Sequence, residues 1–96
     1  MVVSTCQIEL DLPGIGSLKQ KRSSLKSLAA RLHREFNVSA AEVGLHEVWQ
    51  SSTLGVAVVS TAADHGERVL ESAVRWIEAH RPDVTVIDYQ IESLHL

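Results

Sequence analysis

The sequence predicts an α+β fold in which two helices cover one face of a four-stranded antiparallel sheet. Three observations predict it. Apolar and polar residues alternate near both ends of the chain, as they do in half-buried strands. Two longer segments have helical periodicity, each with an apolar stripe on one side only. The 96 residues suffice for one core, so residues 1–96 are expected to form a single domain.

The first strand is expected over Val2–Leu12, where apolar and polar residues alternate. Pro13–Gly16 ends it, because proline lacks the N–H of the sheet ladder and glycine favours turns. Ser17 is a suitable N-cap for a helix that runs to Phe36. Asn37 suits the left-handed residue that often ends a helix.

The middle of the chain predicts two further strands. Val38–Val43 is typical of a short strand, but its inward face stays open because apolar residues lie on both of its sides. Gly44–Ser52 is too long for a tight hairpin and too apolar for an ordinary solvated loop. Thr53–Ser60 is an almost unbroken apolar run. Such a run suits a central strand covered on both faces, or one packed by helices on one face and by a partner on the other.

The second helix is expected to begin near Thr61 and Asp64, which resemble a capping box, and to run to about His80. Val84–Glu92 alternates again and is expected to form the last strand. Two helices cannot cover both faces of a four-stranded sheet, so they should lie on one. Right-handed crossovers then favour the split βαβ, ferredoxin-like βαββαβ sandwich with strand order 4-1-3-2. One face of the sheet is left bare.

This topology predicts a core and an uncovered surface. The residues expected to be buried are Cys6, Ile8, Leu10, Leu25, Leu28, Leu32, Val56, Val58, Leu70, Ala73, Ile77 and Ile87. The small and β-branched residues expected on the bare face are Val3, Thr5, Gly55, Ala57 and Val59. Because apolar side chains there need cover, we expect a homodimer or another protein partner over this face.

The positive charge of the chain is concentrated in the first predicted helix. Six of the nine Lys and Arg residues lie between Ser17 and Arg34, a span without Asp or Glu, although the net charge is −3. A helix N-terminus carries partial positive charge and disfavours cations in its first turn. Residues that break a local rule are more often functional than accidental. The sequence therefore predicts that RNA phosphates dock on four cations, Lys19, Lys21, Arg22 and Lys26.

Two other interpretations of these cations stay open. Runs of charge commonly form a solvated helix face with no binding role. The cations could also pair with acidic residues on a neighbouring element, such as Glu42 or Asp11, and only balance charge.

Trp49 and Gln50 are the candidate partner-binding residues. An exposed Trp is enriched at interfaces, and the alternative is a Trp that closes the open end of the sandwich. The expected central strands, Val2–Leu12 and Thr53–Ser60, contain no aromatic residue. Base stacking on the sheet face, which common ferredoxin-like RNA binders use, is therefore not expected.

No motif in the chain predicts catalysis, and we expect that the protein is not an enzyme. The five His residues include no i, i+4 pair, and the single Cys6 is expected to be a buried thiol, so no metal site is predicted. Gly14-Ile15-Gly16 lacks the third glycine of a dinucleotide fingerprint, and no cofactor is expected. No apolar run reaches the length of a membrane span, and the first residues do not resemble a signal peptide. We therefore expect a cytoplasmic protein without a membrane partner.

Several segments also match a known sequence pattern over nearly the whole chain. They are Leu12-Pro13, Ser17-Leu18-Lys19-x-Lys21-Arg22-x-x-Leu25-Lys26-Ser27-Leu28, Phe36-Asn37-Val38-Ser39, Ala41-Glu42, Trp49-Gln50, Leu54-Gly55-Val56-Ala57 and Val59-Ser60. In these segments the chain resembles the YlxP-like family, small bacterial proteins of unknown function. The resemblance implies a ferredoxin-like fold and genes often set among those of transcription and translation factors. It implies no established activity.

Taken together, the basic helix and the resemblance favour one hypothesis. The protein is expected to be a non-enzymatic binding protein associated with RNA or with a ribosomal subunit. The alternative is a homo-oligomeric protein-interaction or regulatory module that uses the bare sheet face. Salt separates the two, because phosphate docking weakens steeply as salt rises and an apolar interface does not.

Overall fold

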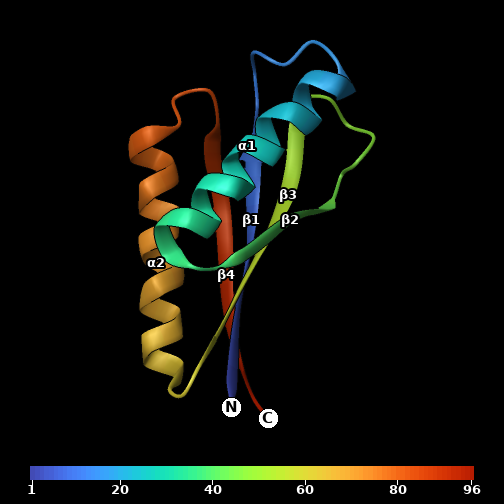
Figure 1. Cartoon of the computed structure of the whole chain (residues 1–96). Helices are drawn as coiled ribbons and strands as arrows, with labels where there is room; N and C mark the ends of the chain where they lie inside the picture. The colour runs from blue at the N-terminus through green and yellow to red at the C-terminus, as the bar shows by residue number, and fades with distance from the viewer.

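The computed structural model describes all 96 residues and confirms the predicted order of elements (Figure 1). The elements are β1 (Val2–Asp11), α1 (Leu18–Phe36), β2 (Ser39–Gly44), β3 (Ser51–Ser60), α2 (Ala63–His80) and β4 (Thr85–His95). Strands β3 and β4 are longer than the sequence predicts, because polar residues at their ends still pair with β1.

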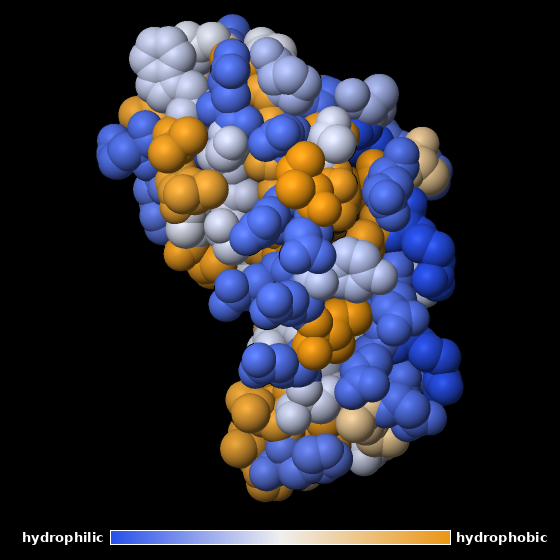
Figure 2. Space-filling view, turned by 180° about the vertical axis from the view of Figure 1, so that it is seen from behind, coloured by the Kyte–Doolittle hydropathy of each residue, from blue (hydrophilic) through white to orange (hydrophobic).

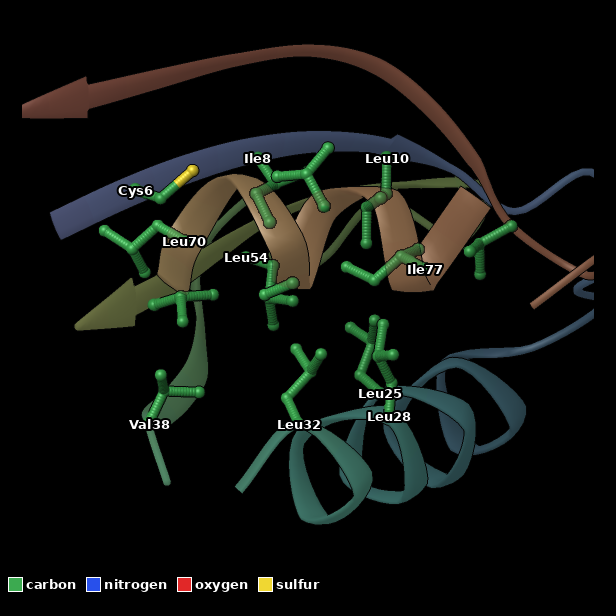
Figure 3. Close-up of a cluster of buried hydrophobic side chains, with 14 of the residues drawn as sticks. Cys6, Ile8, Leu10, Leu25, Leu28, Leu32, Val38, Leu54, Leu70 and Ile77 are labelled. Carbon is green, nitrogen blue, oxygen red and sulfur yellow. The ribbon is translucent and has the colours of Figure 1, made fainter. Parts of the chain in front are cut away.

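The four strands form one antiparallel sheet in the order β2-β3-β1-β4, which is the predicted order 4-1-3-2 read from the other edge. Both helices pack on the same face, as predicted. Along β1 the residues that point to this face are buried, while those between them are more exposed. Figure 3 shows side chains from β1, α1 and α2 meeting in one layer between the sheet and the helices. The fold is therefore the expected two-layer sandwich.

The core contains or contacts every residue predicted to be buried except Ile87. Ile87 is 56 % exposed, and its predicted burial is wrong. The cause is an irregularity in β4: Glu9 pairs with Asp88, whereas the next residue, Leu10, pairs with Val86. Ile87 is the extra residue at this shift and points away from the core. Val86 takes its place against the core cluster.

The capping residues predicted from the sequence are confirmed for α1, but the predicted N-terminal cap of α2 is not. Ser17 is the N-cap of α1, and its Oγ accepts a hydrogen bond from the Gln20 N–H at 3.1 Å. Asn37 ends this helix in the left-handed conformation, with φ at 54°. The predicted capping box of Thr61 and Asp64 is wrong, because α2 begins after Ala62 and has no side-chain cap.

The structure settles the open question of which side of β2 faces the core. Val38, just before the strand, is buried, and the Glu42 side chain also points to the helix side. A bulge follows, since Glu42 pairs with Leu54 while Gly44 pairs with Thr53. This shift places Val43 over Gly55 on the opposite face, where a Cβ on Gly55 would lie 2.8 Å from Val43 Cγ1. The bulge thus separates a polar, inward-facing Glu42 from an outward-facing valine.

The sheet face without helices has the residues predicted for it. Val3 pairs with Val59 and Thr5 pairs with Ala57, and all four point to this side. Figure 2, which views the molecule from behind, shows apolar patches separated by polar side chains. The face is therefore mixed in character and not continuously apolar.

Candidate nucleic-acid interface

Three of the four cations predicted to bind phosphate lie in solvent on one flank of α1. Lys19, Arg22 and Lys26 are exposed, and none of them takes part in any of the salt bridges of the structure. We call these three residues the basic stripe. It extends about 10 Å along the helix axis, at a rise of about 1.5 Å per residue. Three unpaired charges in one row form a surface to which an anionic chain can bind.

The basic stripe points away from α2. The side of α1 that faces α2 is marked by Ser24, whose backbone O and Oγ accept hydrogen bonds from Arg81 at 3.3 and 3.0 Å. Arg31 marks the same side, since its Cζ lies 5.1 Å from the centre of the Trp76 ring. At about 100° per residue, the residues of the basic stripe are rotated by about 120–180° from these two residues. It therefore lies on the outer flank of the sandwich, toward the β2 edge of the sheet.

Lys21 corrects the prediction, because it is not part of this surface. Its side chain is 0 % exposed, and its Nζ lies 2.8 Å from Glu42 Oε2. The ammonium also donates hydrogen bonds to the backbone carbonyls of Leu45 at 2.7 Å, of Ser51 at 3.2 Å and of Val48. An ammonium has only three donors, and these acceptors use all of them. The predicted contact of Lys21 with phosphate is wrong, and the alternative of an ion pair with Glu42 is correct.

The buried ammonium organises the β2–β3 loop, residues 45–50. Burying a charge is costly unless it is paired and fully hydrogen-bonded. Lys21 meets this requirement only while the loop carbonyls point at it. Glu42 is held in turn by Ser52, whose Oγ donates to Oε2 at 2.7 Å. Lys21 is therefore a structural residue that fixes the conformation of the loop next to the first turns of α1.

Gln50 gives the loop a second attachment. Its Nε2 donates hydrogen bonds to the backbone O of Ile15 at 3.1 Å and of Pro13 at 3.4 Å. Its backbone O accepts a hydrogen bond from the Leu12 N–H at 2.9 Å. Gln50 was predicted to contact a partner, and in this structure its amide N–H groups bind the chain that connects β1 to α1. Its role within the molecule is to fix the loop.

Trp49 is 52 % exposed, so it does not close the open end of the sandwich. Its neighbours Leu45 and Val48 are also exposed. Figure 1 shows the β2–β3 loop projecting from the side of the molecule away from α2. The basic stripe faces the same side. The structure thus places a fixed loop, which exposes three apolar side chains and also the acidic Glu47, on the same side of the molecule as the row of free cations.

The sequence analysis gives an ion pair with Glu42 only as an alternative and does not single out Lys21 for it, although two signals pointed to this residue. Lys21 lies within the apolar arc of α1, between Leu18 and Leu25. On β2, Glu42 lies on the same side as Val38, so the two charges converge once both elements pack inward. The first signal is visible in the sequence, but the second depends on the inward face of β2, which the sequence leaves open.

The fold and this surface define a small ferredoxin-like sandwich with a cationic flank. The chain belongs to the family described as "Protein of unknown function (DUF503)", whose family model matches residues 3–91. It is 32 % identical over 78 residues to the "Uncharacterized protein YlxP" of Bacillus subtilis (strain 168), in a match that covers 81 % of this chain and 85 % of that protein. The resemblance to the YlxP-like family is therefore confirmed.

Solved structures show the same fold at low sequence identity. The de novo designed protein Foldit4 matches with a TM-score of 0.55 and 16 % identity, over 99 % of this chain and 97 % of the designed one. A VAO-type flavoprotein from Myceliophthora thermophila C1 matches with a TM-score of 0.55 and 14 % identity. The match covers 97 % of this chain but only 16 % of the flavoprotein. Such likeness shows the fold alone. Neither α1 nor α2 is long and apolar enough to cross a membrane.

Proposed function

We propose that this protein is a non-enzymatic RNA-binding protein, associated with ribosomal RNA or a ribosomal subunit, that docks phosphates on Lys19, Arg22 and Lys26. The observation that carries the proposal is the set of three exposed cations without ion pairs on the outer flank of α1. No acidic residue interrupts the span from Ser17 to Arg34. Lys and Arg bind phosphate chiefly by charge and release the condensed counterions of the nucleic acid.

The rest of the charge distribution supports this surface as the phosphate-binding one. Elsewhere most cations are already neutralised, since Arg31 pairs with Glu35, Arg68 with Asp64 and Arg81 with Asp83. The net charge of −3 disfavours binding over the whole surface. Arg34 and Arg75 are also exposed and without an ion pair, but each stands apart from the row, so the basic stripe is the place where three such cations are grouped.

The alternative is a homo-oligomeric module that uses the bare sheet face. One observation favours it: a shallow groove of about 410 Å³ crosses this face over β1, β3 and β2. Its floor is formed by small residues, Gly55 and Ala57. The same face also carries Glu9, which pairs in register with Asp88, and neither has an ion pair. Two copies packed so that these carboxylates face each other would bring like charges together, which disfavours that arrangement of the homodimer.

The test of the RNA proposal compares two triple variants that remove the same charge. In the first, Lys19, Arg22 and Lys26 are replaced by Gln. In the matched control, Arg31, Arg68 and Arg75 are replaced by Gln. Binding to structured RNA and to small ribosomal subunits is measured across a range of salt concentrations.

Removal of the basic stripe should reduce the slope of log affinity against log salt by roughly 2, at about 0.7 for each phosphate that is no longer neutralised. The control should keep the slope of the unmodified protein. The proposal fails if the unmodified protein shows no salt-sensitive binding, or if the slope falls equally in both triple variants. Sedimentation at the same protein concentrations reports the homodimer independently.

A further inference from the structure

The β2–β3 loop exposes an aromatic side chain that the fold itself does not need. Trp49 has half of its surface in solvent, and Leu45 and Val48 on the same loop are exposed as well. Exposed apolar groups of this size, gathered in one place, mark interaction sites. Of the other aromatic residues, Trp76 is covered by His80, with ring centres 5.0 Å apart, and by Arg31. Phe36 packs against the core, and Tyr89, which is also exposed, lies on β4 at the far edge of the sheet from β2. Trp49 is therefore the aromatic side chain that is free to stack on the side of the β2–β3 loop.

The loop that presents Trp49 is held in one conformation by buried and local contacts. The Lys21 ammonium binds three carbonyls at the loop, including that of Val48, the residue just before Trp49. Gln50, the residue just after it, is bonded to the β1–α1 connection. A turn closes between the Val48 N–H and the Leu45 O at 3.0 Å. A surface fixed before binding loses little conformational entropy when a ligand arrives.

Trp49 and the basic stripe belong to one side of the molecule. Lys21, which binds the loop, lies in the chain between Lys19 and Arg22 of the stripe. The loop projects away from α2 (Figure 1). The contacts of Ser24 and Arg31 place the stripe on the flank of α1 that also points away from α2. An aromatic side chain beside a row of cations is the combination that proteins use to bind single-stranded nucleic acid.

We propose that Trp49 stacks on an unpaired base of single-stranded RNA whose phosphates lie along the basic stripe. This inference rests on the proposed function and names the form of RNA that is bound. Bases in a duplex are already stacked and do not offer a free face to the indole, whereas an unpaired base does. Stacking does not depend on base identity, because every base has a π-face. Lys21 is a positioning residue in this arrangement and touches no nucleotide.

The experiment compares single-stranded and double-stranded RNA at one salt concentration and then across salt. The probe is a fluorescein-labelled RNA of about 12 nucleotides, alone or annealed to its complement. The variants are Trp49→Ala, Trp49→Phe and, as matched controls on the same loop, Leu45→Ala and Val48→Ala. The triple variant of the basic stripe is measured beside them.

Trp49→Ala should weaken binding of the single strand by roughly 5- to 150-fold, the effect of losing one stacked base. It should leave duplex binding and the salt slope unchanged. Trp49→Phe should retain most of the affinity, and Leu45→Ala and Val48→Ala should each have a much smaller effect. In a Trp76→Phe background, the fluorescence of Trp49 should be quenched by the single strand and not by the duplex.

Distinct outcomes overturn the inference and the proposed function. If the salt slope falls in the basic stripe variant but Trp49→Ala binds the single strand as the unmodified protein does, the stacking inference is wrong and the RNA proposal stands. If no RNA binds in a salt-dependent manner, both are wrong. If Leu45→Ala and Val48→Ala weaken single-strand binding as much as Trp49→Ala, the loop acts as a general apolar contact, as at a protein interface, and stacking is wrong.

Discussion

The Lys21 ammonium lies 2.8 Å from the Glu42 carboxylate, and the lysine side chain has no exposed surface. This ion pair joins the first turns of α1 to the end of β2, and the same ammonium holds the β2–β3 loop, which follows β2, through backbone carbonyls. The sequence places Lys21 among the cations predicted to bind phosphate. In the structure it is buried, and it fixes the loop next to the exposed cations of the basic stripe.

Replacing Lys21 with Met should destabilise the fold by about 3 kcal/mol, because the Glu42 carboxylate, two loop carbonyls and the carbonyl of the first β3 residue lose their common donor. The measurement is the free energy of unfolding in urea. Lys19→Met is the matched control, since this neighbouring lysine is exposed, and it should change stability by less than about 0.5 kcal/mol.

The double variant Lys21→Met, Glu42→Leu should recover part of the lost stability, because it removes the carboxylate left without a partner. If Lys21→Met is as stable as Lys19→Met, the ammonium does not support the loop and the positioning role is wrong.

Gly66 on α2 lies against β1 so closely that alanine does not fit there. A Cβ on Gly66 would lie 2.4 Å from Ser4 Oγ and 2.9 Å from Ser4 Cβ. Ser4 is buried and bonded to Ser93, so it has little room to move. Gly66→Ala should therefore destabilise the protein by about 1–3 kcal/mol, although alanine favours a helix.

The control for Gly66 is Gly14→Ala, since a Cβ on Gly14 would meet nothing within 4 Å. Thermal unfolding should give a lower Tm for Gly66→Ala and nearly the same Tm for Gly14→Ala. Adding Ser4→Gly to Gly66→Ala should restore part of the Tm. Equal Tm values for the two glycine variants would contradict the close approach of α2 to β1.

The ion pair of Arg81 with Asp83 gives the fold a dependence on acid pH. Arg81 donates from Nε to Oδ1 and from Nη2 to Oδ2 of Asp83, each at 2.9 Å. These hydrogen bonds hold the pKa of Asp83 below its ordinary value. A lowered pKa in the folded state means that the stabilisation is present above the unfolded pKa, near 4, and is lost as the pH falls through the folded pKa.

The expected size is below about 1 kcal/mol, because half of the Asp83 side chain is exposed. Urea unfolding of the unmodified protein and of Asp83→Asn should differ near neutral pH. The two free energies should converge below about pH 3. Curves for the two proteins that stay parallel down to that pH would contradict the contribution of this pair.

The sequence predicts the fold well because its determinants are local. Alternation, helical periodicity and the residues at the ends of α1 are each set by neighbours in the chain. The predictions are wrong at residues whose orientation is set by a contact with a part of the chain distant in sequence. Ile87 follows the alternation of β4, but a register shift against β1 that no local pattern records turns it outward.

The candidate site was only partly predictable for the same reason. Lys19, Arg22 and Lys26 are free because nothing packs on their flank of α1, and helical periodicity alone groups them. The position of Lys21 depends on the inward side of β2, which the sequence left open. The exposure of Trp49 depends on the conformation of a loop that is fixed by three contacts from another element.

A thiol on the core side of the sheet and a thiol on the bare face should be labelled at very different rates. Cys6 points into the core and is buried, and burial raises the pKa of its thiol to about 11. Since only the thiolate reacts, Cys6 should be labelled by a disulfide reagent at pH 8 only when the protein unfolds. The logarithm of its labelling rate should therefore rise in Lys21→Met in proportion to the loss of stability, because the rate follows the population of the unfolded state.

The variant Val59→Cys, made in a protein with Cys6→Ser, places a single thiol on the bare face. Val59 is 65 % exposed, so this thiol should react at nearly the rate of a free thiol. The rate should not change as the protein concentration is raised, because the unpaired carboxylates on this face oppose packing against a second copy. A labelling rate that falls steeply with protein concentration would show that a second copy covers the face. It would favour the homo-oligomeric alternative over the view that this surface is solvated.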